Sequence, residues 1–146
     1  MSYLAARPSR DLVRAARQEI TREWWDNRRG QFDLYISQFV LDEAGDGDET
    51  AAARRLTLLD GISLLPLSDE VLDTARSLIS GGVLPDNAQG DAVHIAAATV
   101  HEMDVLLTWN CRHLANAVIL GNVGRHLRNL GYEAPIICTP DELLGE

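Results

Sequence analysis

The chain has 146 residues, of which 46% are hydrophobic and only 5% aromatic, enough for one domain with a core of aliphatic side chains. No apolar run approaches the roughly 20 residues of a membrane span, and the N-terminus lacks the apolar segment of a signal peptide. We therefore expect a cytoplasmic protein that does not enter a membrane. The two cysteines, Cys111 and Cys138, form neither a C-x-x-C pair nor a zinc pattern, and we expect buried thiols.

The net charge of -9 is unevenly spread, and the basic residues are all arginine. Residues 1–29 carry seven Arg and four acids, a net charge of +3, so the remainder carries -9 - 3 = -12. Phosphate contacts dominate nucleic-acid affinity, so an acidic protein needs a local basic surface to bind RNA. The Arg-rich first segment is the candidate, although its arginines can equally pair with neighbouring acids on a solvated helix face.

Helices and strands are expected to alternate along the chain. Pro8-Ser9 opens a helix that ends before Gly30, and residues 32–36 alternate like a strand. Ser37 can cap a short helix carrying Glu43, and Thr50 can cap the next helix, through Leu59. The remaining expected elements are strand 62–66, a helix from Ser68 to Gly81-Gly82, helix 90–101, strand 105–109, a helix near 122–130, strand 135–138 and a helix opened by Thr139-Pro-Asp-Glu142.

Strands that alternate with helices imply parallel pairing, so we predict a single α/β domain over residues 1–146: a three-layer α/β/α sandwich with a mainly parallel sheet. Only four strands are visible in the sequence. The chain also enters with a helix, whereas a doubly wound domain usually begins with a strand.

Three oxygen-bearing side chains are expected at the carboxyl edge of this sheet, where ligands gather in open parallel sheets. Glu43 lies in the helix after the first visible strand, Asp91 opens the helix before strand 105–109, and Asn110 follows that strand. Oxygen donors suit Mg²⁺ or Mn²⁺, which can activate water and neutralise a scissile phosphate. The simpler interpretations are a first-turn acid for Asp91, a solvated acid for Glu43 and a turn residue for Asn110.

Four further residues are candidates for supporting the site or contacting substrate. His94 is three residues after Asp91 on the same helix face, and it either orients Asp91 or packs against the neighbouring alanines. Thr108 either supports the site by hydrogen bonding or simply favours the strand. Arg112 and His113 follow Asn110 and can approach a phosphate or lie at the surface.

Residues 32–44 (FDLYISQFVLDEA), 90–101 (GDAVHIAAATVH) and 105–114 (VLLTWNCRHL) together resemble the PIN-domain family, in particular the VapC-type toxins of bacterial toxin–antitoxin pairs. The resemblance implies a parallel α/β/α sandwich, a Mg²⁺ or Mn²⁺ site and endoribonuclease activity, with an RNA substrate, an antitoxin protein as partner and a homodimer. It matches Glu43 and Asp91 to two acidic metal ligands, and Asn110 to a position where many members carry Asp.

The chain departs from the family at its beginning. Family members start with a central strand that ends in an acidic ligand, and Met1-Ser-Tyr-Leu resembles the segment just after it. We therefore expect an N-terminally truncated domain that lacks one strand and one ligand, with impaired activity. The alternative function is a non-catalytic PIN-like remnant that binds a partner protein or RNA. A phosphoacceptor signalling domain is disfavoured because the chain has no lysine, and a nucleotide-binding domain because it has no glycine-rich phosphate motif.

Overall fold

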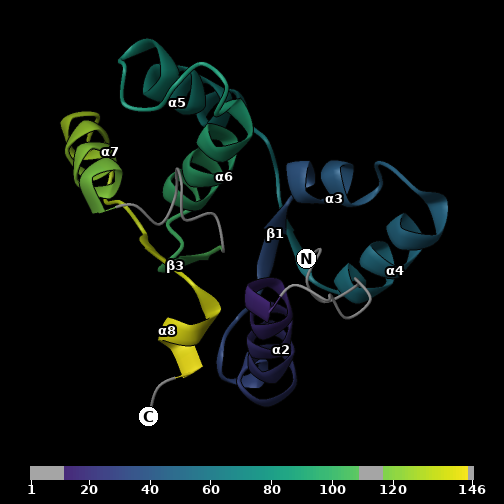
Figure 1. The fold of residues 1–146 in the computed structure, drawn as a ribbon. Coiled ribbons are helices and arrows are strands. Elements are labelled where there is room, and N and C mark those ends of the chain that lie inside the picture. The colour runs from purple at the N-terminus through teal and green to yellow at the C-terminus, as the bar shows by residue number, and fades with distance from the viewer. Residues whose placement is uncertain (1–11, 109–116, 145–146) are drawn as a thin grey trace. The chain divides into compact units, whose positions relative to one another are not determined.

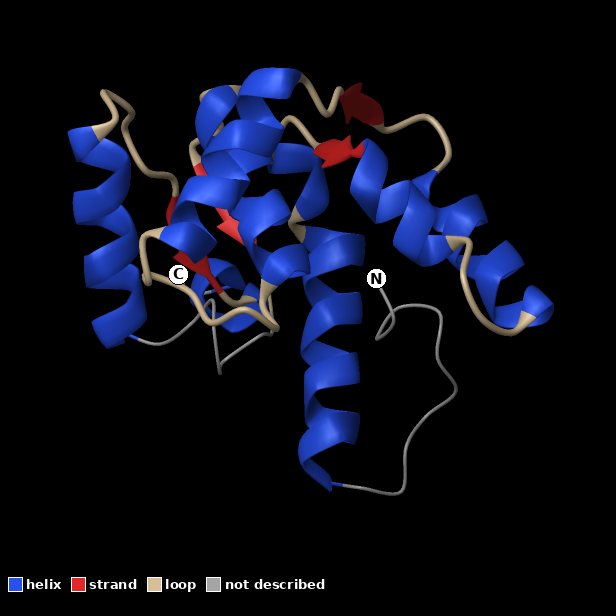
Figure 2. Cartoon of the chain, turned by 90° about the horizontal axis from the view of Figure 1, so that it is seen from above, coloured by secondary structure: helices blue, strands red, loops and turns tan. Residues whose placement is uncertain are grey.

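The computed structural model describes residues 12–108 and 117–144 and has a mixed α/β architecture with two small parallel sheets. Figure 1 traces the chain, and Figure 2 distinguishes the helices from the short strands. The chain divides into two compact units, which comprise residues 1–64 with 140–146, and residues 65–139.

The first unit combines helices with the sheet formed by β1 and β2. Its elements are α2 (Leu12–Asn27), the short 3-10 helix η1 (Arg29–Gln31), β1 (Tyr35–Ser37), α3 (Gln38–Ala44), α4 (Glu49–Leu59), β2 (Ser63–Leu65), which reaches the unit boundary, and α8 (Pro140–Leu144). Helix α2 packs against α8, and Trp24 is buried with its ring 5.8 Å from that of Phe32. The large aromatic side chain thus supplies apolar area that small residues such as Ala44 and Ala52 do not.

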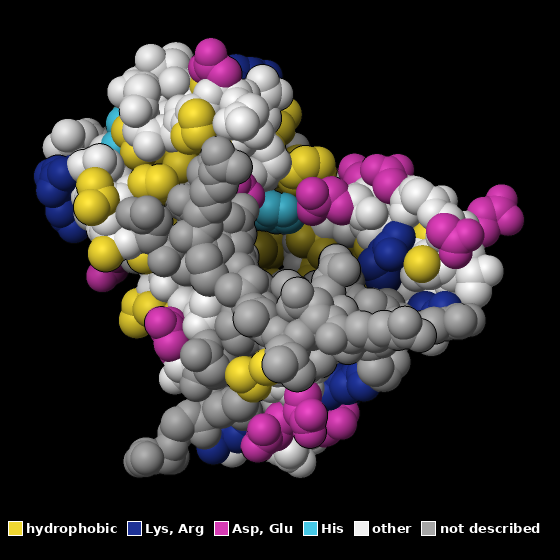
Figure 3. All heavy atoms as spheres, in the orientation of Figure 1, with side chains coloured by type: hydrophobic (Ala, Val, Ile, Leu, Met, Phe, Trp, Pro, Cys, Tyr) yellow, Lys and Arg dark blue, Asp and Glu magenta, His cyan; other side chains and the backbone are white. Residues whose placement is uncertain are grey.

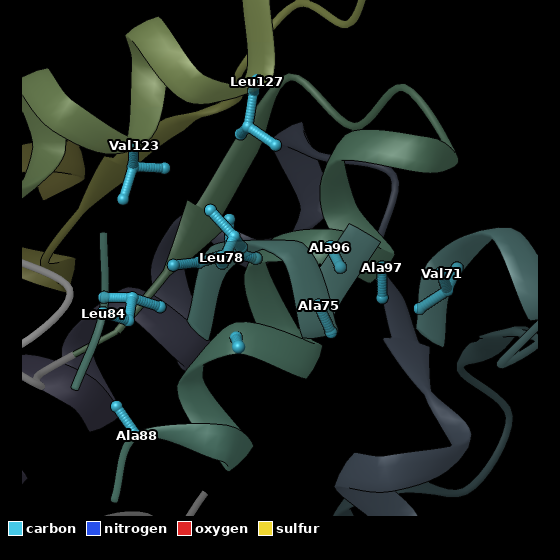
Figure 4. Packing of buried hydrophobic residues seen from close by; sticks show 11 residues of the cluster. Val71, Ala75, Leu78, Leu84, Ala88, Ala96, Ala97, Val123 and Leu127 are labelled. Atoms are coloured by element: carbon cyan, nitrogen blue, oxygen red, sulfur yellow. The ribbon is translucent and has the colours of Figure 1, made fainter. Parts of the chain in front are cut away.

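The second unit holds the main hydrophobic core. Its elements are α5 (Asp69–Ser80), α6 (Gln89–Val100), β3 (Val105–Leu107), α7 (Ala117–Asn129) and β4 (Ile136–Cys138). Leu78 of α5 is fully buried among side chains of α6 and α7, and Figure 4 shows it between Ala96 on one side and Val123 and Leu127 on the other. The side chains that α6 turns to the core are small, mainly Ala92, Ala96 and the neighbouring alanines, and this lets α5 pack closely along the length of α6.

Strands β3 and β4 pair in parallel, with Leu106 opposite Ile137. The alternation of helices and strands and the parallel pairing confirm the coarse prediction of an α/β fold. The described strands form two separate sheets of two strands each rather than one. The three-layer sandwich and the single domain over residues 1–146 therefore remain predictions.

Side-chain caps mark the starts of helices α3, α4 and α5. Ser37 Oγ accepts a hydrogen bond from the Val40 amide at 3.3 Å, and Ser68 Oγ accepts one from Val71, as predicted for both caps. The cap predicted at Thr50 is wrong. Asp48 takes that position instead, and its Oδ2 accepts from the Ala51 amide at 3.0 Å.

Candidate functional site

The structure distributes the predicted site residues over both units. Glu43 lies on α3 in the first unit, whereas Asp91, His94 and Thr108 belong to the second. The other three candidates, Asn110, Arg112 and His113, lie outside the described residues. The expected meeting of Glu43, Asp91 and Asn110 at one sheet edge stays a prediction.

Helix α6 carries the strongest part of the candidate site. Six of its residues are buried (Ala92, Ile95, Ala96, Ala97, Ala98, Thr99), so the helix is covered around most of its circumference. Asp91 and His94 are its only ionisable side chains, and both are half-buried. Their spacing of three residues places them on one helix face. An acid and an imidazole thus share one face of a helix that is otherwise largely apolar.

Asp91 also has a local role. The residue before the helix, Ala88, is buried in the core and offers no side-chain cap to the first turn. Asp91 is the one acid in that turn, where a negative charge interacts favourably with the free amides and the helix dipole. The helix dipole therefore accounts for an acid at this position.

Thr108 directly follows β3 and extends its ladder. Its amide donates to the carbonyl of Cys138 on β4 at 2.9 Å, so the parallel pairing continues through this residue. The half-buried side chain of Thr108 thus sits at the carboxyl end of β3, where the sequence placed it. Cys138 itself is a buried free thiol, as predicted.

Glu43 lies in the last turn of α3 and is exposed. An acid at this end of a helix is disfavoured by the helix dipole. Arg55 of α4 offsets that effect: its Nε donates to the Ala44 carbonyl at 3.0 Å and its guanidinium Nη2 donates to the Asp46 carbonyl at 2.7 Å. Arg55 therefore satisfies carbonyl groups at the C-terminal end of α3, the helix that carries Glu43, and links α3 to α4.

The surface around this helix end is dominated by acids, as Figure 3 shows over α3 and α4. The exposed carboxylates there are Asp42, Glu43, Asp46, Asp48 and Glu49. Within residues 12–108 and 117–144, no group of three or more His, Cys, Asp or Glu side chains is placed to hold a metal ion. The carboxylate oxygens of Glu43 and Asp91 suit Mg²⁺ or Mn²⁺, but the described side chains alone do not form a complete coordination site.

Sequence reasoning missed a polar seam that joins α5 to α7 and the loop after it. The Tyr132 hydroxyl donates to Glu70 Oε1, and Ser77 Oγ lies 3.0 Å from His126 Nε2. Glu70, Thr74 and Ser77 follow one face of α5 at helical spacing, and that stripe of polar and small residues was the available signal. The seam joins residues that are 49 and 62 positions apart in the chain.

The seam also perturbs one titration. The hydrogen bond to Glu70 raises the pKa of Tyr132, and burial and the negative charge of Glu70 act in the same direction, while a hydrogen bond with Thr74 opposes them. Neutral Tyr132 is favoured because ionisation would remove the donor and place two negative charges side by side.

No protein-family model, no curated protein and no solved structure matches the chain. The PIN resemblance therefore rests on the sequence motifs quoted above. None of the described helices has the length and apolar character needed to cross a membrane.

Proposed function

We propose that this chain is a PIN-type, metal-dependent endoribonuclease that acts in the cytoplasm and resembles the VapC toxins. The observation that carries the proposal is the segment from α6 to β3. Its helix carries the D-A-V-H-I-A motif, with Asp91 and His94 as the only ionisable side chains, and is followed by the parallel strand β3, which Thr108 directly follows.

In this proposal Asp91 and Glu43 hold a Mg²⁺ or Mn²⁺ ion together with Asn110. The ion would activate water and neutralise charge on the scissile phosphate. His94 orients Asp91 or contacts the RNA, because it lies one turn further along the same helix face. Thr108 supports the carboxyl end of β3, and Arg112 and His113 approach the phosphate. The proposed partners are an RNA substrate, an antitoxin protein and a second copy of the chain.

A non-catalytic PIN-like remnant is the second candidate. The observation that favours it is that the described residues contain no group of three metal-ligating side chains. Such a protein would bind RNA or a partner protein without cleaving it.

The decisive experiment measures cleavage of a fluorescently labelled RNA with Mn²⁺ and with EDTA. The Asp91→Asn and Glu43→Gln variants are compared with Asp86→Asn and Glu133→Gln, which change exposed acids of the second unit in the same chemical way. We expect Mn²⁺-dependent cleavage that falls by at least about 100-fold in the first pair, since even weaker perturbations of metal sites cost 10–100-fold. The control pair should retain it.

The results test the assigned metal ligands and separate the two candidate functions. Cleavage that survives both Asp91→Asn and Glu43→Gln would exclude the assigned metal ligands. Mn²⁺-independent binding of RNA with no turnover by the unaltered chain would reject the nuclease and favour the remnant. Circular dichroism of every variant separates loss of a ligand from loss of fold.

A further inference from the structure

Helix α7 turns one polar face outward. Val123 and Leu127 are buried in the core of the second unit, and these two residues fix how the helix is rotated about its axis. The residues on the opposite side are exposed and recur at helical spacing: Gly121, Asn122, Arg125, Arg128 and Asn129. Together they form a continuous surface of arginine, asparagine and glycine, which we call the outer face of α7.

The outer face of α7 carries positive charge and no acid of its own helix. Every other α-helix within residues 12–108 and 117–144 contains at least one Asp or Glu, whereas α7 contains none. Arg125 and Arg128 are three residues apart, so they are neighbours on the helix surface. Figure 3 shows a basic patch over α7, at the left of the view. In a chain with a net charge of -9, this face is a local basic surface.

The two arginine side chains are placed alike, each over the glycine four residues before it. A methyl group added to Gly121 would lie 3.9 Å from Nη1 of Arg125. One added to Gly124 would lie 3.6 Å from Nη1 of Arg128. The Arg125 guanidinium also donates to the side-chain carbonyl of Asn122, a neutral partner that does not offset its charge. Each glycine costs the helix about 1 kcal/mol relative to alanine, and in return the backbone is open to close approach by a ligand.

Stabilisation of the helix itself explains only part of this arrangement. Arg128 lies in the last turn, where a cation interacts favourably with the helix dipole. The dipole does not explain why the outer face lacks acids. Helix α5, for example, sets Asp73 2.7 Å from Arg76 on its exposed surface. The sequence of α2, the other Arg-rich helix, mixes three arginines with three acids. The outer face of α7 is therefore the more uniformly basic surface.

Phosphate groups fit the chemistry of this face. A guanidinium group binds phosphate through two parallel hydrogen bonds, and two neighbouring arginines can hold successive phosphates of one strand. Asparagine amides are further donors of the kind that contact phosphate and sugar.

We propose that the outer face of α7, with Arg125 and Arg128 at its centre, is the surface on which this protein holds the phosphate backbone of single-stranded RNA. The identity of the ligand as RNA rests on the proposed function. The surface itself is the same for a nuclease and for a non-catalytic remnant that binds RNA.

The test measures binding of a fluorescently labelled single-stranded RNA by anisotropy, in EDTA and at several salt concentrations. The double variant Arg125→Gln/Arg128→Gln should bind at least about tenfold more weakly at low salt, because hydrogen bonds to charged groups are lost. The slope of log Kd against log salt should fall by about 1.4, since each phosphate contact on a single strand contributes about 0.7. Arg125→Lys/Arg128→Lys should keep the slope and lose part of the affinity, because lysine retains the charge but not the paired hydrogen bonds.

The matched control is Arg54→Gln/Arg76→Gln, which removes two exposed positive charges from α4 and α5. This control should keep both the affinity and the slope. An equal loss in the control would show that net charge alone matters and would overturn the proposal. Unchanged binding by the α7 variant, or no binding by the unaltered chain at low salt, would do the same. Competition by polyglutamate as effective as that by unlabelled RNA would assign the face to acidic polymers and reject RNA as its ligand.

The cleavage assay separates this proposal from the nuclease itself. A chain that binds RNA through Arg125 and Arg128 without cleaving it would support the surface and reject the nuclease. A chain that cleaves RNA and is indifferent to both arginines would reject the surface and leave the nuclease standing. Circular dichroism of each variant verifies that these exposed substitutions leave the fold intact.

Discussion

Gly81 caps the C-terminal end of helix α5 with φ -79° and ψ 0°, a bridge-region conformation with negative φ that alanine can also adopt. From the backbone alone, Gly81→Ala should stabilise the protein by about 0.4–1 kcal/mol, because alanine lowers the entropy of the unfolded chain. A methyl group at this position, however, would lie 2.8 Å from the Ser77 carbonyl oxygen and 3.0 Å from His126 Cε1. The first contact is with the backbone, which cannot move aside as a flexible side chain can.

Overpacking of this kind costs about 1–3 kcal/mol. Because this cost exceeds the entropic gain, we expect Gly81→Ala to lower the free energy of unfolding by about 1–2 kcal/mol. Gly124→Ala is the matched control, because Gly124 lies inside α7 and its nearest contact would be the mobile end of Arg128, at 3.6 Å. That variant should be more stable than the unaltered protein by up to about 1 kcal/mol.

Urea unfolding followed by circular dichroism measures both changes, provided that the denaturant slope is unaltered. Opposite signs for Gly81→Ala and Gly124→Ala are the expected outcome. If Gly81→Ala is stabilising like the control, the close approach of His126 and the end of α5 is not present in solution. Adding His126→Ala should recover only part of the loss, since the contact with the Ser77 carbonyl remains.

Three further predictions concern other contacts. Leu78→Ala should cost about 3–5 kcal/mol in unfolding experiments because Leu78 is fully buried, whereas Leu56→Ala, at a position 41% exposed, should cost less than about 1 kcal/mol. The raised pKa of Tyr132 means that its bond to Glu70 persists below the ordinary tyrosine pKa and is lost as the pH rises through the raised value. In an absorbance titration, Glu70→Gln should therefore lower the Tyr132 pKa, with Tyr132→Phe identifying its signal; no difference would refute the pairing. Arg55→Met should lower stability in thermal unfolding by about 1–2 kcal/mol, because it removes both hydrogen bonds to the end of α3.

Local signals in the sequence predicted the start of a helix correctly where a single side chain caps it. Ser37 and Ser68 were found as caps because a hydroxyl before a helix satisfies a free amide in the first turn. The same reasoning placed a cap at Thr50, whereas Asp48 caps this helix; both residue types can act as caps, and only the path of the chain distinguishes them. Helix α7 begins at Ala117, before the predicted start near 122, because a continuous apolar stretch gives no helical period.

The candidate site was predictable only in its individual residues. The first-turn position of Asp91 and the strand that precedes Thr108 follow from local pattern. Contacts across long stretches of chain, such as Tyr132 with Glu70 or Arg55 with the end of α3, depend on how helices pack. The polar stripe on α5 marks a face for such contacts, but no local pattern identifies the partner residues. The separation of the strands into two sheets is likewise a property of packing and not of any one segment.

The polar seam between α5 and α7 has a consequence for the protons of His126. The Ser77 hydroxyl donates its single hydrogen to the Thr74 carbonyl at 2.7 Å, so towards His126 Nε2 it can only accept. With the hydroxyl hydrogen placed there, Nε2 of the neutral imidazole is the nitrogen that donates to Ser77, and Nδ1 lies on the side of Gly81. The chain of donors from His126 through Ser77 to the Thr74 carbonyl thus selects one tautomer of the neutral ring and ties α7 to the backbone of α5.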